Sequence, residues 1–488
     1  MHDPDHPLAR HFLSEIWDSL AGEKTAFDRV RFEGPGALLS AFAVTDLAAA
    51  SFAAAGLALS DLVAAAGADA PGVRVDRRLA SGWFDLPVGP SQPLAPPKEP
   101  QPTHGWMCEF QTADDRWLRM QASFPTLRTR IAQTLGTKED PGAFETEIRK
   151  HPAEEIEQIL VDAGAAVALS RSVEEWRAHP QGRSVATEPL VHIEPGGESS
   201  STWLPTPGRP LAGIRVLDLT RVISGPMGTR FLAACGAEVL RLEPPGSDES
   251  RVFWGRGTDI MLGKRWAFLD LRTEDGRERF LELLSEADVL VHGYRPGGLD
   301  ALVAPDLRAA TRPGLVEVAL NAYGWTGPWQ NRRGFDTLVQ FSSGLADATT
   351  AWALADPGKR TPINALGRLV AADRPRHLPV EALDFATGYL IAAAAIQGLT
   401  RRVMTGEGSV SRLSLARTAK MLIDAGQGAE EPEIGLPLSG PYVPGVFSSG
   451  DGPVRRLEFP VSIEDNPLFW ERPFEAAGSS TPTWSTRR

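Results

Sequence analysis

The residue whose position most suggests chemistry is Asp384, a carboxylate just before the alanine-rich apolar segment 386–399. A carboxylate at the start of a helix is often an N-cap, because its oxygens accept hydrogen bonds from the free N–H groups of the first turn. The same group can act as a nucleophile when it is shielded from water and lies next to an electrophilic carbonyl. Composition alone leaves both roles open.

A second candidate site follows the apolar segment 214–219, in the stretch from Asp218 to Pro226 (DLTRVISGP). A Gly-Pro pair where a strand turns into a helix leaves backbone N–H groups free at the helix start, which suits an anionic ligand, although a simple tight turn has the same composition. Basic residues recur nearby and indicate either a polyanionic ligand, such as a phosphorylated nucleotide, or a solvated surface. They are Arg221, Arg241, Arg251, Arg256, Lys264, Arg265, Arg272 and Arg295.

These candidates need a scaffold, and residues 212–345 supply one by alternating short apolar strands with amphipathic helices. This alternation predicts an α/β layer with a mostly parallel, Rossmann-like sheet. A strand-turn-strand pattern over 107–121, followed by helical segments, predicts a second and smaller α+β unit. The strands expected in the larger unit are 214–219, 238–242, 266–271, 289–292 and 315–320.

Stretches rich in proline and glycine divide the chain into units. We expect, in chain order, a degenerate copy of a helix-strand junction (1–84), a proline-rich linker (85–104), a small α+β domain (105–193), a second linker (194–211), a Rossmann-like domain (212–348), the helix of Asp384 with its following strand (349–425) and a Gly/Pro-rich tail of loops (426–488).

The first unit is interpreted as a copy because Ser40–Leu57 resembles Ala382–Leu399, and a pair of shorter segments downstream repeats the resemblance. Two alanine-rich helices can also resemble each other by chance. In this alignment Phe42 stands where the second copy has Asp384. We therefore expect the N-terminal copy to be structural only.

Composition excludes several classes of protein. The 488 residues carry a net charge of -12, which argues against general nucleic-acid binding. No membrane helix or secretory signal is expected, and the two cysteines, Cys108 and Cys235, fit a reducing cytoplasm. The G-x-S-x-G, H-E-x-x-H, C-x-x-C, Walker A and complete G-x-G-x-x-G motifs are missing, and the scattered histidines predict no metal site.

Motifs spread over residues 213–415 resemble, in order, those of the family III CoA-transferases, the CaiB/BaiF group of formyl-CoA transferase, carnitine CoA-transferase and alpha-methylacyl-CoA racemase. Segments 110–118 and 163–181 resemble later parts of the family, so the segment order looks rearranged. The motifs are Gly213–Pro226 (GIRVLDLTRVISGP), Gly236–Gly246 (GAEVLRLEPPG), Gly263–Arg272, Ala287–Gly297, Tyr323–Pro328, Gly334–Asp336, Asp384–Gly388, Gly406–Gly408 and Leu413–Leu415.

The resemblance implies a Rossmann-like CoA-binding domain plus a smaller α+β domain, and an enzyme that moves CoA from an acyl-CoA donor to a carboxylic acid acceptor. Asp384 would be the nucleophile that carries an aspartyl-CoA thioester. No permanently bound cofactor is implied, acyl-CoA is a substrate, and the family forms homodimers. Pro244 stands where some members have an arginine. The positions that match the family's CoA site are Ile223, Ser224, Leu269, Asp270, Leu271, Arg272, Gly293, Tyr294, Arg295, Asn321, Ala322, Tyr323 and Gly324.

Two alternatives remain. A 2-methylacyl-CoA racemase of the same fold uses a histidine and an aspartate, and the histidine position holds Phe335 here, so two-base proton exchange would lose one partner. A CoA-binding protein without catalysis would fit the rearranged order and Phe42, and the retained Asp384 counts against it.

Overall fold

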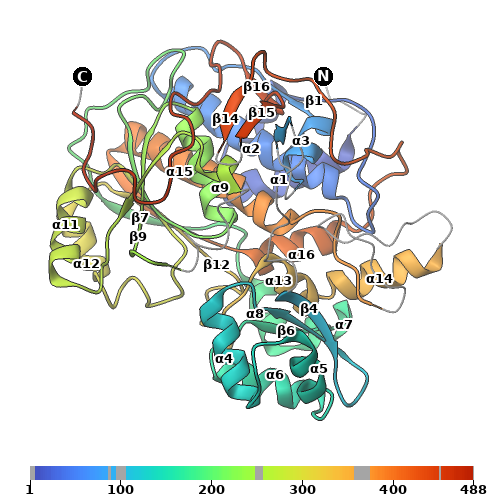
Figure 1. Cartoon of the computed structure of the whole chain (residues 1–488). Helices are drawn as coiled ribbons and strands as arrows, with labels where there is room; N and C mark the ends of the chain where they lie inside the picture. Colours follow the sequence, from blue (N-terminus) through green and yellow to red (C-terminus); the bar gives the residue numbers. More distant parts are fainter. Residues whose placement is uncertain are drawn as a thin grey trace.

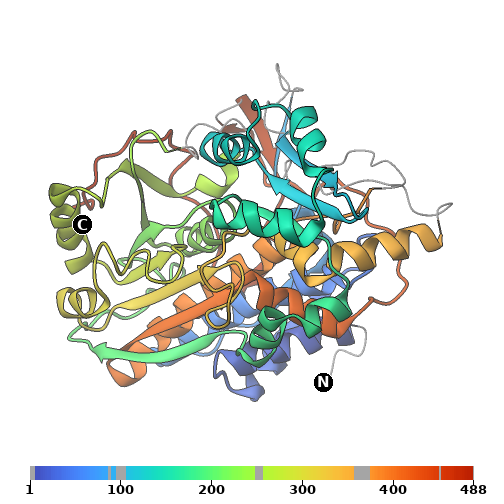
Figure 2. The ribbon, with the colours of Figure 1, turned by 90° about the horizontal axis from the view of Figure 1, so that it is seen from below.

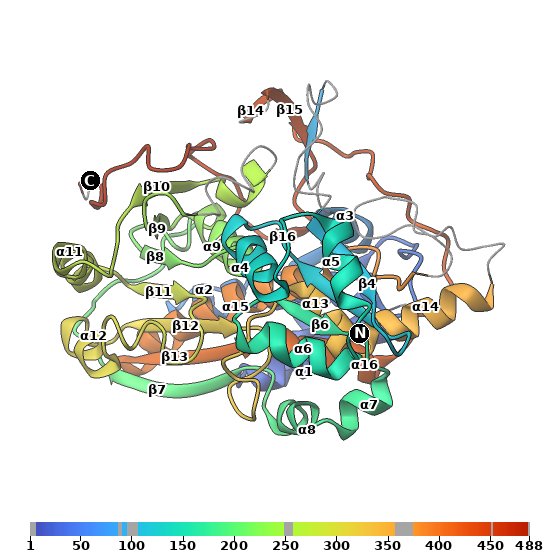
Figure 3. The same ribbon diagram turned by 60° about the horizontal axis from the view of Figure 1, so that its bottom comes forward.

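A seven-stranded sheet forms the centre of the computed structural model, which describes residues 6–85, 90–94, 106–247, 257–356, 374–449 and 452–486 (Figure 1). The order is β10-β9-β8-β11-β12-β13-β7, and all neighbours are parallel except β7, which pairs antiparallel with β13 (Figures 2 and 3). The predicted α/β layer with a mostly parallel sheet is confirmed, and its parallel part has the doubly wound order of a Rossmann sheet. The strands are β7 (His192–Glu198), β8 (Arg215–Leu219), β9 (Glu238–Glu243), β10 (Lys264–Phe268), β11 (Val289–His292), β12 (Val316–Asn321) and β13 (Glu407–Ser414).

The central strands are buried on both faces, as parallel strands under helices must be. Val216 of β8 packs in the cluster that contains α9 and α15, whereas its neighbour Leu217 packs with Phe280 of α11 on the other face. Successive strand residues therefore serve two separate cores. The helices of this unit are α9 (Ser224–Ala234), α11 (Glu274–Ser285), α12 (Pro305–Thr311), α13 (Asp336–Ser343), α14 (Leu345–Ala355), α15 (Ala382–Thr405) and α16 (Leu415–Ala425).

Helix α15 is the central helix of the core, and it packs against α9 and α2. Two glycines allow the close approach of α9. A Cβ on Gly228 would lie 2.6 Å from the carbonyl oxygen of Gly388, and a Cβ on Gly388 would lie 2.6 Å from that of Ser224. Any larger side chain at either position would force the helices apart. The first turn of α9 consequently lies beside the first turns of α15.

The N-terminal helices repeat this architecture. Helix α2 packs along α15. The parallel pair β1–β2 and helix α2 correspond to the parallel pair β12–β13 and helix α15. The two junctions match without a gap. Val44 and Ala382 begin the long helices, and Asp76 and Ser414 cap the helices after the strands, each pair 338 positions apart. The elements are α1 (Pro7–Ser19), β1 (Val30–Glu33), α2 (Val44–Ala65), β2 (Val73–Asp76) and α3 (Arg77–Trp83).

This match corrects the predicted alignment of the two copies. Both long helices start from the same tight turn, in which the first helical N–H donates to the carbonyl two residues earlier at 2.8 Å, so Phe42 corresponds to Val380. Asp46, not Phe42, is the counterpart of Asp384. The sequence alignment failed because alanine-rich helices fit one another equally well in several registers.

The small domain consists of a three-stranded antiparallel sheet and short helices, and it lies at the bottom of the view in Figure 1. Its main core joins Phe110, Leu118 and Ile131, and a smaller cluster around Phe124 packs on Phe341 of α13. The elements are β4 (Met107–Gln111), β5 (Trp117–Gln121), β6 (Val167–Leu169), α4 (Pro125–Leu135), α5 (Pro141–Ile148), α6 (Ala153–Asp162), α7 (Val173–Ala178) and α8 (Pro180–Thr187).

Three predicted boundaries differ from the structure because distant strands pair with segments that look like loops in sequence. The expected linker 194–211 begins inside β7, and the Rossmann-like sheet extends past residue 348 to β13. The expected loop tail contains β16, which adds to β2, and β15, which pairs with β3 from the first linker. The remaining strands are β3 (Ser91–Pro93), β14 (Phe447–Ser449), β15 (Gly452–Arg456) and β16 (Val461–Ile463).

Two helices in the described ranges, α2 and α15, are long and apolar enough by composition to cross a membrane. Their mean hydropathy over the most apolar window is 1.7 and 1.3, but 83% and 94% of those windows are buried inside the protein. Burial of this extent is what core helices show, so the hydropathy is weak evidence for a membrane span.

The contact between α9 and α15 can be tested with Gly228→Ala. The added methyl group would meet the Gly388 carbonyl oxygen at 2.6 Å, so we expect the free energy of unfolding to fall by about 1–3 kcal/mol in denaturant titration. Gly435→Ala is the matched control, since a Cβ there has nothing within 4 Å, and it should change stability by less than about 0.5 kcal/mol. Equal effects of the two substitutions would contradict the packing argument.

Candidate active site

The predicted CoA-site segments all follow carboxyl ends of parallel strands. Ile223 and Ser224 follow β8, 269–272 follow β10, 293–295 follow β11 and 321–324 follow β12. Strands β8 and β11 are neighbours at the point where the strand order reverses, which is where open α/β sheets bind ligands. The fold therefore gathers these segments at one edge of the sheet.

Tyr294 gives electrostatic evidence that three of these segments meet. Burial raises the pKa of Tyr294, and the charges of Arg221, Asp270 and Arg272 act on the same hydroxyl. Arg272 itself is exposed and forms a 2.7 Å ion pair with Asp270. The loops after β8, β10 and β11 thus lie within electrostatic range of one another.

Asp384 lies in the first turn of α15 and is 5% exposed. Its backbone N–H donates to Asp336 Oδ2 at 2.8 Å, and the N–H of Leu383 donates to the same carboxylate. Asp336 begins α13, where the Gln340 amide also donates to it. Burial raises the pKa of Asp384 well above its usual range, and the Asp336 charge raises it further.

Two further buried carboxylates belong to this cluster, and sequence reasoning missed both: Glu381 lies within electrostatic range of Asp336 and Asp384, and Asp85 lies within range of Glu381. Glu381 is the N-cap residue of α15, one turn before Asp384, and Asp85 follows α3. Burial raises the pKa of Asp85 to about 6, and that of Asp336 also to about 6. The three-residue spacing from Asp384 could have indicated Glu381, but Asp85 reaches the site only through tertiary packing.

Asp46 occupies the corresponding helix position in the N-terminal copy, and there the aspartate has a counter-ion. Its carboxylate forms a 3.0 Å ion pair with Arg77, which is fully buried and also binds Glu431 at 2.7 Å. The residue that corresponds to Arg77 in the second copy is Leu415. Asp384 consequently keeps its buried position without the arginine that neutralises Asp46.

Four arginines lie within electrostatic range of one another, and they are the best candidates for phosphate binding. Burial lowers the pKa of Arg333, and the charges of Arg295, Arg130 and Arg221 lower it further. Like charges this close are stabilised by a polyanion. Arg221 and Arg295 were predicted from sequence, whereas Arg130 comes from α4 of the small domain and Arg333 from the loop before α13.

Most of the other predicted cations have structural roles. Lys264 is fully buried, forms a 3.0 Å ion pair with Asp218 and donates to the Pro226 carbonyl at 2.7 Å, which fixes the turn into α9. Arg241 lies over the Trp266 ring, and Arg265 pairs with Glu238 at 3.2 Å. Arg251 and Arg256 fall outside the residues that the structure describes.

The segment after β12 is a rigid turn. The Asn321 side chain accepts from the N–H of Gly324 at 2.9 Å and donates to its carbonyl at 2.7 Å. Gly324 has φ +103°, and Tyr323 is fully buried with its hydroxyl 3.0 Å from Ser342. Ala322 accepts from the N–H of Ala416 at 2.9 Å. These contacts fix the conformation of the loop. Contacts of residues 321–324 with CoA stay a prediction.

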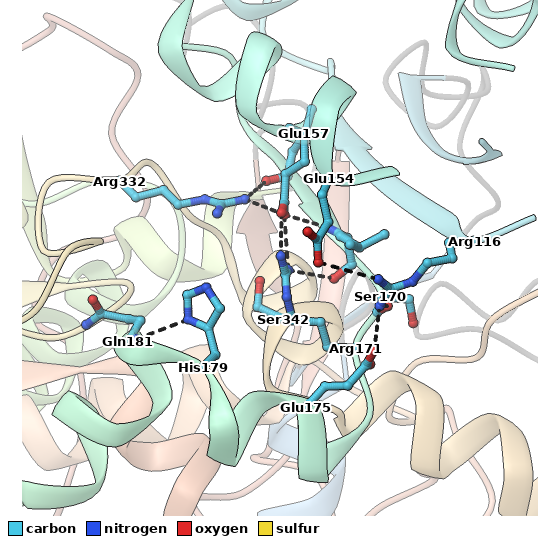
Figure 4. A network of polar contacts seen from close by, with 12 residues as sticks. Arg116, Glu154, Glu157, Ser170, Arg171, Glu175, His179, Gln181, Arg332 and Ser342 are labelled. Carbon is cyan, nitrogen blue, oxygen red and sulfur yellow. Dashed lines mark hydrogen bonds and ion pairs between the residues drawn. The ribbon is translucent and has the colours of Figure 1, made fainter. Parts of the chain in front are cut away.

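A buried ion network holds the loop that carries Arg333 (Figure 4). Glu157 of α6 accepts from Arg171 at 2.5 Å and from Arg332 at 2.7 Å, and Arg332 lies 3.9 Å from the Trp329 ring centroid. Nearby arginines hold the pKa of Glu157 at about 2 despite its burial. The network connects the small domain to the start of α13, where Asp336 lies four residues after Arg332.

Part of the chain is similar to known proteins. The pattern of CoA-transferase family III matches residues 211–436, which include Asp336, Glu381 and Asp384. This part of the chain is thus similar to CoA-transferase family III. The CaiB/BaiF resemblance inferred from the motifs is thereby confirmed.

Several curated members of the family are similar to this chain. A probable fatty acyl-CoA transferase of Mycobacterium tuberculosis is 32% identical over 220 residues, covering 43% of this chain and 51% of that protein. The acetyl-CoA:oxalate CoA-transferase of Acetobacter aceti is 37% identical over 152 residues, covering 29% and 39%. The chain spans about half the length of the curated relatives it matches. A crystal structure of a hypothetical Mycobacterium tuberculosis protein is 31% identical over 44% of this chain and 56% of its own, with a TM-score of 0.36.

The ion network predicts a defined pH dependence of stability for Glu157→Gln. The folded-state pKa of Glu157 is about 2 against an unfolded value near 4.5, so the carboxylate stabilises the fold above pH 4.5 and loses this contribution as the pH falls towards 2. At pH 7 we expect Glu157→Gln to lower the free energy of unfolding by about 3 kcal/mol, since two buried arginines lose their counter-ion.

Glu147→Gln is the control for this prediction, because Glu147 pairs with Lys150 in an exposed contact at 2.7 Å. It should cost less than about 1 kcal/mol in denaturant titrations at pH 7. A wild-type stability for Glu157→Gln, or a difference that persists unchanged down to pH 2, would contradict the role of the network.

Proposed function

We propose that the chain is a CoA-transferase that moves CoA from an acyl-CoA donor to a carboxylic acid acceptor, with Asp384 as its nucleophile. The observation that carries this proposal is the buried carboxylate at the start of α15, which lies within the region that matches the family and forms no ion pair with any basic residue that the structure describes. In the first step an Asp384 oxygen attacks the thioester carbonyl, the C–S bond breaks, and CoA leaves as a thiolate. The product is a mixed anhydride.

The next steps follow from the same chemistry. The thiolate attacks the Asp384 carbonyl, releases the donor acid and forms an aspartyl-CoA thioester. The acceptor carboxylate then attacks that thioester, and the sequence runs in reverse to give the new acyl-CoA. Each step exchanges one acyl bond for another, so water must stay out, and the burial of Asp384 provides this exclusion.

The environment of Asp384 suits a nucleophile. Its pKa is raised by burial and by Asp336, so its ionised form is a stronger base than a solvated carboxylate. The positive end of the α15 dipole supports the ionised form during attack. Burial raises the pKa of Asp46 as well, but its ion pair with Arg77 opposes this rise, which supports Asp384 rather than Asp46 as the reactive copy.

Binding of CoA at the sheet edge would explain why four arginines lie close to one another there. We infer that Arg221, Arg295, Arg333 and Arg130 receive the phosphates, because guanidinium groups bind phosphate oxygens in a bidentate manner. The loop after β11 and the start of α9 would then direct the pantetheine thioester towards the first turn of α15. The relatives named above are described as acting on fatty acyl-CoA and on acetyl-CoA with oxalate, which is consistent with a thioester donor and a carboxylate acceptor.

The residue that stands in place of the racemase histidine does not support the racemase alternative. Phe335 stacks on Phe124 with ring centroids 5.6 Å apart, in the apolar contact between α13 and the small domain. No imidazole stands there to exchange a proton with a substrate. A two-base mechanism would need another group.

The proposal is tested by trapping the acyl-enzyme. The purified protein is incubated with acyl-CoA donors, quenched with hydroxylamine, and its peptides are mapped by mass spectrometry. We expect a donor-dependent hydroxamate on Asp384. Asp384→Ala should give no label at this position and should lower the transferase rate by at least about 10³-fold, because the covalent route is lost.

Asp46→Asn is the matched control, since Asp46 occupies the corresponding position of the N-terminal copy. It should leave the label on Asp384 in place, with folding checked by circular dichroism. CoA transfer that continues at the wild-type rate in Asp384→Ala would overturn the assignment, as would a label on Asp46 instead of Asp384.

A further inference from the structure

Glu381 occupies an unusual place for an acidic side chain. It is the N-cap residue of α15, yet its side chain caps none of the first-turn N–H groups. The residue is 9% exposed, and its Oε2 is buried with no hydrogen-bond partner in the described structure. A buried polar atom without a partner costs free energy, so such an atom at a substrate site is a candidate to bind a ligand.

The groups that face Glu381 are carboxylates from three elements. Asp336 reaches it from α13, Asp384 from the next turn of α15, and Asp85 from the end of α3. In the described residues, none of these four carboxylates forms an ion pair with an arginine, lysine or histidine. Burial raises the pKa of Glu381 well above its usual range, and the charges of the neighbouring carboxylates raise it further. Both effects favour the protonated form of Glu381.

The protonated form of Glu381 has a property that an aspartate or glutamate normally lacks at neutral pH. A neutral carboxylic acid carries one O–H donor, and when it is buried it can donate a hydrogen bond to an oxygen that becomes negative during a reaction. Residues at spacing i, i+3 lie on the same face of a helix, so Glu381 and Asp384 are directed to the same side of α15. A donor is thus held beside the nucleophile.

We propose that Glu381 is a further catalytic residue, whose carboxylic acid donates a hydrogen bond to the thioester carbonyl oxygen while Asp384 attacks the carbonyl carbon. This inference rests on the proposed transferase function and adds to it the group that stabilises the tetrahedral oxyanion. It also gives a role to the second oxygen of Glu381, which has no hydrogen-bond partner among the residues that the structure describes.

The step balances without any additional reactant. An Asp384 oxygen forms the new C–O bond, and the carbonyl electron pair moves onto the substrate oxygen, where the Glu381 O–H donates to it. When the carbonyl re-forms, the C–S bond breaks and CoA leaves as a thiolate. The proton stays on Glu381 throughout, so the same donor serves each later acyl transfer.

Activity then requires one ionised and one protonated group in this pair. Rate should rise with pH as Asp384 ionises and fall at higher pH as Glu381 ionises, which gives a bell-shaped profile whose two apparent pKa values belong to the coupled pair. Asp85 and Asp336, with pKa values near 6, contribute to the acidic side of the profile. The alkaline side is the part that Glu381 controls.

The test compares Glu381→Gln and Glu381→Leu over a pH series of kcat and KM, with an acyl-CoA and a carboxylic acid that the wild-type enzyme accepts. Glu381→Gln keeps an N–H donor that cannot ionise, so we expect kcat within about 10-fold of wild type and loss of the alkaline decline. Glu381→Leu removes the donor, and kcat should fall by about 10²–10³-fold with KM changed by less than about threefold. Glu430→Gln, at an exposed position, is the control and should keep the wild-type profile.

The outcomes separate this inference from the transferase proposal. A wild-type alkaline decline in Glu381→Gln, or a Glu381→Leu enzyme that is folded and fully active, would overturn the role of Glu381 even where hydroxylamine still labels Asp384. Failure of wild-type labelling at Asp384 would instead overturn the transferase mechanism itself. If Glu381→Leu does not fold, the profile of Glu381→Gln decides the question by itself.

Discussion

The organisation of this protein depends on the hydrogen bonds by which Asp336 accepts the backbone N–H groups of Leu383 and Asp384. These bonds join the start of α13 to the start of α15 and replace the caps that the first turn of α15 otherwise lacks. They also place Asp384 beside Asp336 in a buried region. Burial raises the pKa of both carboxylates, the Asp336 charge raises that of Asp384 further, and the two N–H groups offset part of the rise for Asp336. The reactivity proposed for Asp384 is a direct consequence of this single junction.

Other contacts hold the junction in place from a distance. The Glu157–Arg332 ion pair fixes the loop that enters α13. The small domain therefore helps to position Asp336 at the start of α13. The glycine contact at Gly228 and Gly388 brings the start of α9 against α15. The proposed CoA-binding edge of the sheet and the carboxylate cluster are therefore positioned by different elements that converge on the same helix.

The duplicated junction shows how small a change separates the proposed reactive site at Asp384 from a structural site at Asp46. Asp46 and Asp384 occupy the same position of equivalent helices, and both are buried. Arg77 follows β2, whereas Leu415 follows β13, so within the described ranges the first aspartate has a counter-ion and the second has none. A buried ion pair is stable and unreactive, while a buried carboxylate without a cation holds its proton tightly and is strongly basic once it ionises.

The sequence by itself determined the alternation of strands and helices, the family motifs and the position of Asp384, because period-2 and period-3.6 patterns and local turn residues are encoded locally. It could not determine which residues from separate units meet. Glu381 has a local signal in its spacing from Asp384, but Asp85, Arg130 and Arg333 join the site only when α3, α4 and the loop before α13 pack together. The register of the two copies and the strands β7 and β16 were also decided by tertiary structure, since alanine-rich helices and Gly/Pro-rich strands carry little sequence information about their partners.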